Sequence, residues 1–221
     1  FGVRMLMRKW LSQRRYIQAQ QQLGKGMTLM ALEDFKRAEK AFQHSAELAL
    51  DKLPAYLAAS QAARAQQALQ RAEDYLLLAE TPTNRLTVQL ARVRLWIDTG
   101  QWEAAAASLK MLYSHDKKQP VIAELLLQVL LKLQVWPELM QMLPLLIKTL
   151  ALGNYDSLIK DACQHSLQWL AQTGNRVDKI ATLKRLHDFW ATLPAFVQHD
   201  ADIIQSYAQA AVTIGFDEEA E

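Results

Sequence analysis

The chain has 221 residues, of which 51% are apolar and 22% are charged, so it can bury the core of a globular protein. Its single cysteine, Cys163, excludes an intramolecular disulfide, and no stretch approaches the roughly 18 consecutive apolar residues of a membrane span. The net charge is only +2, but six of the 25 basic residues lie within the first 32 positions, which hold no acidic residue.

Composition favours helices throughout the chain. Glycine and proline are scarce, at 7 and 6 residues, whereas Ala, Leu, Gln, Lys and Arg are abundant. These abundant residues lose little side-chain freedom in a helix. Because no convincing run of alternating β-branched residues occurs, we expect an all-α protein.

The first predicted helix runs from about Trp10 to Ala31. Seven more are predicted over 35–50, 54–66, 69–80, 85–99, 102–115, 120–134 and 136–150. Pro54, Pro120 and Pro137 fall at helix starts, where the missing N–H costs nothing. Pro144 falls inside the last of these helices and should kink it or end it.

A period of 34 residues organises these helices. Trp102 and Trp136 lie 34 positions apart, and further steps back from Trp102 reach Ala68 and Phe35. Each of these positions opens a run with small or apolar residues on one face, such as Ala104 to Ala107. This period is typical of tetratricopeptide repeats, abbreviated TPR. We therefore predict a right-handed α-solenoid of TPR-like antiparallel hairpins, in which TGQWEAAAASL (99–109) joins two helices.

Three segments are predicted along the chain. Residues 1–22 form a basic juxtamembrane helix segment, residues 23–152 carry the TPR-like repeats, and residues 153–221 continue as longer helical hairpins. The final GFDEEA repeats the pattern of the TGQWEA joint. We therefore expect that the chain is an excised segment of a longer protein and that its last hairpin is truncated.

The sequence contains no recognisable catalytic or metal-binding motif. The stretch LGKGM at 23–27 lacks the third glycine of a dinucleotide fingerprint and the Gly-Lys-Ser/Thr of a phosphate loop. Cys163 and His165 are two positions apart on a predicted helix, so their side chains point in different directions and cannot share one ion. A catalytic pair of carboxylates contributed by two distant helices is an alternative that the sequence leaves open. We predict no catalytic residue, no metal, no cofactor and no enzymatic activity.

The basic N-terminal segment allows three interpretations: a membrane-proximal helix, a nucleic-acid-binding arm, or a solvated first helix. Apolar residues such as Met7, Trp10 and Leu11 alternate with the bases, which favours a helix at a membrane interface. We predict no nucleic-acid partner. The residues predicted to lie near the membrane are Arg4, Arg8, Lys9, Arg14 and Arg15.

A concave face is the candidate binding surface of such a solenoid. Steps of 34 residues place side chains of the first helix of each hairpin in three rows. These rows are Tyr56, Leu90 and Glu124; Ser60, Arg94 and Gln128; and Arg64, Asp98 and Lys132. Their polar and charged members suit an extended peptide or a partner helix. A solvated face without a ligand is the alternative.

Five segments in this order carry a family resemblance: LGKGMTLMALEDFKRAEKAF, PAYLAASQAA, RAEDYLLLAE, LARVRLWIDTGQWEAAAASL and VWPELMQMLPLLIKTL. Over about residues 10–215 the chain resembles the HemY-type membrane-anchored TPR proteins of proteobacteria. One departure is AQQAL at 65–69, which lacks the glycine usual at that turn.

The resemblance implies a link to a late step of protohaem formation, and two membrane spans before this region with further repeats after it. With the basic flank, it places this domain on the cytoplasmic side of the bacterial inner membrane. We therefore predict a non-catalytic scaffold or adaptor that binds protein partners, among them haem-synthesis enzymes or other membrane proteins. The alternative is a protein that binds haem or porphyrin directly and so handles tetrapyrroles.

Overall fold

The computed structural model describes residues 2–151, 153, 155–173 and 178–215, except for the side chains of residues 2–6, 8 and 9. Over these residues the protein is all-helical, with twelve helices and no strand, which confirms the predicted fold class. The chain divides into two compact units, Phe1–Thr99 and Gly100–Glu221. The predicted solenoid, its right-handedness and its TPR-like hairpins stay predictions.

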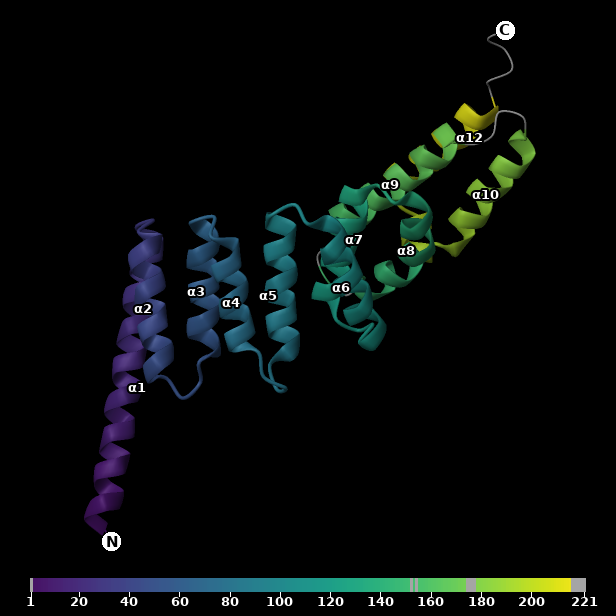
Figure 1. The fold of residues 1–221 in the computed structure, drawn as a ribbon. Helices are drawn as coiled ribbons and strands as arrows, with labels where there is room; N and C mark the ends of the chain where they lie inside the picture. Colours follow the sequence, from purple (N-terminus) through teal and green to yellow (C-terminus); the bar gives the residue numbers. More distant parts are fainter. Residues whose placement is uncertain (1, 152, 154, 174–177, 216–221) are drawn as a thin grey trace. The chain divides into compact units, whose positions relative to one another are not determined.

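The first unit holds five helices, which are α1 (Gly2–Ala31), α2 (Phe35–Leu48), α3 (Leu53–Ala65), α4 (Leu69–Ala79) and α5 (Arg85–Asp98). The second unit holds α6 (Trp102–His115), α7 (Pro120–Leu133), α8 (Trp136–Leu150), α9 (Asp156–Thr173), α10 (Lys179–Thr192), α11 (Ala195–Gln198) and α12 (Ala201–Gly215). The helices of the first unit follow one another side by side (Figure 1), and each packs on the next along the chain.

Helix α1 differs from the expected bounds, whereas helix α8 has the expected bounds although Pro144 was expected to kink it or end it. Helix α1 begins at Gly2 instead of Trp10, because residues 4–9 are Arg, Met, Leu and Lys, all good helix formers. Helix α8 contains Pro144 and still continues to Leu150. Its buried side chains, among them Leu143 and Ile147, are 0% exposed. Their packing outweighs the roughly 3 kcal/mol that an internal proline costs a helix.

A left-handed residue precedes four of the helices at a nearly constant spacing. Glu33 has a φ of 59°, Gln67 59°, Gly100 76° and Gln134 55°. These residues lie 34, 33 and 34 positions apart, and each stands two positions before a helix start, at α2, α4, α6 and α8. The repeat period that the sequence predicts thus recurs in the backbone. Only Gly100 is the residue type that usually occupies this conformation.

The turn at AQQAL ends helix α3 without the glycine that usually occupies the left-handed position. The amide N–H of Gln67 donates to the carbonyl of Arg64 at 2.8 Å, and that of Ala68 donates to the carbonyl of Ala63 at 3.0 Å. This pair of bonds satisfies the last carbonyls of α3 in a Schellman-type helix end. Gln67 therefore takes the position that a glycine would be expected to hold.

Small residues let the helices of the first unit approach closely. The buried cluster contains Ala38, Ala59, Ala62, Ala63 and Ala72, with larger side chains between them. Gly26 of α1 lies against the ring of Phe42 on α2, which is 1% exposed. A methyl group at Gly26 would stand 2.9 Å from Cζ of that ring and closer still to two other ring carbons. The second glycine of LGKGM is therefore a packing residue.

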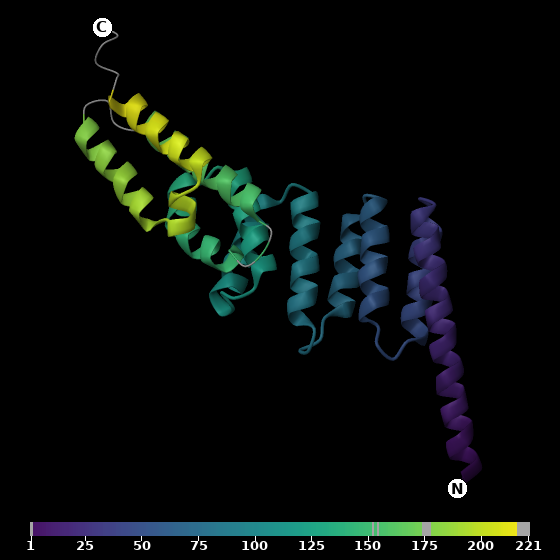
Figure 2. The ribbon, with the colours of Figure 1, turned by 180° about the vertical axis from the view of Figure 1, so that it is seen from behind.

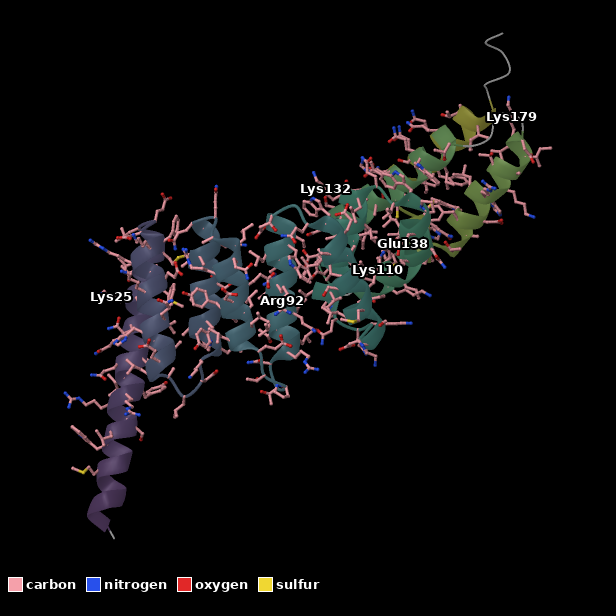
Figure 3. All side chains as sticks on the ribbon, in the orientation of Figure 1. Lys25, Arg92, Lys110, Lys132, Glu138 and Lys179 are labelled. Carbon is pink, nitrogen blue, oxygen red and sulfur yellow. The ribbon has the colours of Figure 1, made fainter. Side chains whose placement is uncertain are left out.

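In the second unit the core is built from leucine-rich helices. The side chains of Leu126 and Leu130 on α7 and of Leu139 and Leu146 on α8 are 0% exposed. Lys110 of α6 forms an ion pair with Glu138 of α8 at 2.6 Å, and Figure 3 shows the two side chains next to each other. Further along the chain, α9 packs on α8 and α12.

Candidate partner-binding surface

The predicted concave-face residues fall on three helices of two units. Tyr56, Ser60 and Arg64 lie on α3, and Arg94 and Asp98 lie on α5, all within the first unit. Glu124, Gln128 and Lys132 lie on α7 of the second unit.

A cavity between α3 and α5 collects three of the predicted residues. Its volume is about 210 Å³, and Ser60, Arg64 and Arg94 line it. Gln61 of α3 and Thr87 of α5 add polar groups to the lining, and the apolar part consists of Leu57, Leu76, Ala91 and Leu95. The structure therefore gathers two guanidinium groups beside an apolar wall.

Arg64 and Asp98 form an ion pair that links α3 to α5, as their placement in one predicted row implies. Their side chains are 40% and 48% exposed, so the pair contributes at most about 1 kcal/mol to stability. Arg94 is also exposed, and within the described part of the chain it forms no ion pair. Of the five residues in this unit, these three carry charge at the surface.

Tyr56 and Ser60 are engaged inside the unit. The hydroxyl of Ser60 donates to the carbonyl of Ala72 on α4 at 2.9 Å, and the residue is 6% exposed. The ring of Tyr56 stacks on that of Tyr75, with centroids 6.4 Å apart and planes 23° apart. These contacts bind α3 to α4, so Ser60 and Tyr56 contribute more to packing than to an open face.

The three α7 residues also have partners. The amide of Gln128 donates to the Glu124 carboxylate at 3.3 Å. The Lys132 ammonium lies 5.8 Å from the centroid of the Trp102 ring, in cation–π geometry. Lys132 and Gln128 are exposed, and Figure 3 labels Lys132 on the second unit. They give this unit a polar surface that combines a neutral amide with a positive charge.

A second cavity lies between α9 and α12 and was not anticipated. Its volume is about 390 Å³, and it is lined by Gln164, Gln168, Gln172, Ser206, Gln209 and Thr213 together with two alanines. These polar groups are neutral amides and hydroxyls that can both donate and accept hydrogen bonds. The spacing of four residues between the three α9 glutamines was the available sequence signal.

A buried charge in the first unit serves the packing. Glu39 of α2 is 7% exposed and accepts hydrogen bonds from Tyr75 Oη at 2.8 Å, Gln66 Nε2 at 2.6 Å and Arg71 Nε at 3.1 Å. Burial works to raise the pKa of Glu39, but these hydrogen bonds and the Arg71 charge hold it below its usual value. The network joins α2 to α4 and to the end of α3.

Residues with metal-binding or nucleophilic chemistry stay apart. Among the described residues, no group of three or more His, Cys, Asp or Glu could hold a metal ion. Cys163 is buried, and burial raises the pKa of its thiol to about 12, with the Asp200 charge acting in the same direction. His165 is exposed and stacks on the Trp136 ring at 6.1 Å.

The first half of α1 extends beyond α2, as Figures 1 and 2 show from opposite sides. Its exposed fractions are 57% at Trp10, 57% at Tyr16 and 48% at Ile17, whereas Ala19 is 1% exposed. The Arg14 guanidinium lies 5.2 Å from the Trp10 ring centroid. The side chains of Arg4, Arg8 and Lys9 lie outside the described residues, and Arg15 is exposed. No described helix is long and apolar enough to span a membrane.

Residues 1–67 match the family model described as HemY protein N-terminus. The match covers α1, α2 and α3 up to the left-handed residue Gln67. It confirms the HemY-type resemblance of the sequence over this part of the chain. No curated protein matches the chain.

Proposed function

We propose that this HemY-type protein is a non-catalytic scaffold or adaptor that binds protein partners through polar faces of its helices. The observation that carries the proposal is the cavity between α3 and α5, where Arg64 and Arg94 stand beside an apolar wall. Charged groups around apolar surface suit recognition of a polypeptide, because the charges select and orient a partner while the apolar area supplies affinity. A right-handed TPR-like solenoid would extend this face along successive hairpins.

We further propose that the protein works at the bacterial inner membrane, with this domain on the cytoplasmic side. Support comes from α1, where exposed Trp10, Tyr16 and Ile17 occur together with Arg14 and Arg15. Aromatic and basic residues favour the interface of an anionic bilayer. The family description supports a link to haem biosynthesis. We propose haem-synthesis enzymes or other membrane proteins as the partners.

Capture of partners from detergent-solubilised membranes tests the scaffold. The wild type is compared with a triple variant, Arg64→Ala, Arg94→Ala and Lys132→Ala. A matched control, Lys40→Ala, Lys118→Ala and Lys184→Ala, removes the same charge from exposed sites elsewhere. We expect specific partners to be lost from the first variant and kept by the control. Identical partners for all three proteins would refute the proposed binding face.

The alternative, direct binding of haem or porphyrin, rests on the resemblance. It predicts that haemin added to the purified domain gives a saturable Soret shift larger than that of nonspecific adsorption, since haem needs an axial ligand in an apolar cleft. Saturable binding of one haemin would replace the scaffold as the better explanation of the haem link.

A further inference from the structure

We propose that the cavity between α3 and α5 binds the side-chain carboxylate of an acidic residue in an extended peptide segment of the partner, with Arg94 as the principal cation. The inference rests on the proposed partner-binding function and names the chemistry that this site recognises. Helix α5 carries three arginines, of which Arg92 and Arg94 have different surroundings.

Arg92 is already neutralised by its neighbours. Its guanidinium pairs with Glu73 at 3.1 Å and with Glu80 at 3.4 Å, and its side chain is only 18% exposed. The carboxylates of Glu73 and Glu80 therefore pair with Arg92 and not with Arg94. Within the described part of the chain Arg94 has no acidic partner, although it lines the cavity. The cavity thus carries an unbalanced positive charge.

Asp98 shows that a carboxylate can dock at this place. It pairs with Arg64 from the opposite helix, and Arg64 lines the cavity together with Arg94. One guanidinium is therefore occupied by a carboxylate of the chain itself, and the second one is open to a carboxylate from outside. Guanidinium groups bind carboxylates through two parallel N–H···O bonds, which orients the ligand as well as attracting it.

The size and lining of the cavity favour a carboxylate on an aliphatic stem. Its volume of about 210 Å³ is about seven times the roughly 30 Å³ that one water molecule occupies, which accommodates a glutamate side chain. Leu57, Leu76 and Leu95 would contact the methylene groups, while Gln61 and Thr87 can hydrogen-bond the peptide backbone. A polyanion such as nucleic acid is disfavoured, because Asp98 already pairs with Arg64 and Arg94 is the one cation of the lining without an ion pair among the described residues.

The test uses the full 221-residue chain and NMR titration with N-acetyl-glutamate N-methylamide, whose only charge is the side-chain carboxylate. The neutral probe is the corresponding glutamine compound, and a third probe is N-acetyl-alanine with a free terminal carboxylate. We expect a saturable shift of the Arg94 Nε–H signal with the glutamate probe, and at least about tenfold weaker binding of the two others. Arg185, which is exposed and has no ion pair among the described residues, is the internal control.

Two variants sharpen the result. Arg94→Gln should reduce affinity for the glutamate probe by about tenfold or more, because it removes the guanidinium that is open to the carboxylate. A tenfold loss corresponds to about 1.4 kcal/mol of binding free energy. Asp98→Asn should raise affinity by about threefold, because it frees Arg64. Equal shifts at Arg94 and Arg185, preference for the terminal carboxylate, or an unchanged affinity in Arg94→Gln would overturn the inference.

Partner capture separates this inference from the proposed function. If the triple variant loses partners that Arg94→Gln keeps, and the glutamate probe does not shift the Arg94 signal, the scaffold function stands and the carboxylate site is refuted. If the glutamate probe binds at Arg94 but the triple variant captures the same partners as the wild type, the carboxylate site stands and the proposed function through this face fails.

Discussion

The left-handed residue Gln67 leads to a test of the repeat geometry. Its φ of 59° lies in the region that costs a residue with a side chain about 1–2 kcal/mol. Gln67→Gly removes this strain but adds freedom to the unfolded chain, worth about 0.4–1 kcal/mol. We therefore expect a net stabilisation of about 0.5–1 kcal/mol, in spite of the general cost of glycine.

Gln67→Ala is the matched control, because it shortens the exposed side chain and retains the backbone strain. Thermal unfolding followed by circular dichroism should give a melting temperature about 2 °C or more higher for Gln67→Gly than for Gln67→Ala. The converse change, Gly100→Ala, should destabilise by about 1 kcal/mol, since its φ is 76°. A Gln67→Gly variant that melts at or below the temperature of Gln67→Ala would refute the argument.

Three further predictions concern the first unit. Gly24→Ala should raise the free energy of unfolding by about 0.5–1 kcal/mol, because Gly24 lies in α1 with open space around it, whereas Gly26→Ala should lower it by about 1–3 kcal/mol through overlap with Phe42. Urea denaturation of the two variants measures both effects, and equal effects would contradict the assigned packing. The lowered pKa of Glu39 means that its ionised form stabilises the fold above the unfolded pKa of about 4.3, and that this contribution is lost as the pH falls through the folded value. The stability difference between wild type and Glu39→Gln should therefore be largest near pH 7 and shrink below pH 4, and a difference independent of pH would argue against an ionised Glu39. Vesicles rich in anionic lipid should shift the fluorescence of Trp10 to shorter wavelength, measured as the difference between wild type and Trp10→Phe, with no such shift for neutral vesicles; an identical response to both lipids would count against the electrostatic part of the membrane proposal.

The helices could be predicted from sequence because several local signals agree. The 34-residue period, Pro54 and Pro120 at helix starts and the alanine-rich faces place the boundaries of α2 to α8 within a few residues of those observed, whereas the start of α1 lies eight residues earlier than expected. Pro144 does not end α8, since its local penalty is smaller than the packing of the leucines around it. The left-handed conformation of Gln67 and Gln134 could not be predicted from the residue type, because glycine is the residue that usually indicates this conformation in a sequence.

The binding surface could be predicted only in part. The 34-residue step correctly made Arg64 and Asp98 neighbours, because both stand at equivalent positions of successive helices. It did not reveal that Ser60 would be buried against the Ala72 carbonyl, which depends on how closely α4 approaches α3. The glutamine-lined cavity between α9 and α12 depends on contacts between helices far apart in sequence, beyond the part where the period is regular.

The continuity of α1 has a mechanical consequence. The helix is 30 residues long, about 45 Å, and runs unbroken from its exposed first half into the half that packs on α2. The exposed first half is therefore held at a set distance and a set rotation from the half that packs on α2. Inserting four residues within residues 11–17 would move the two ends about 6 Å further apart and turn one by about 40° against the other. Helix α1 thus acts as a rigid rod, and its length in residues fixes how far its exposed aromatic and basic side chains stand from the rest of the first unit.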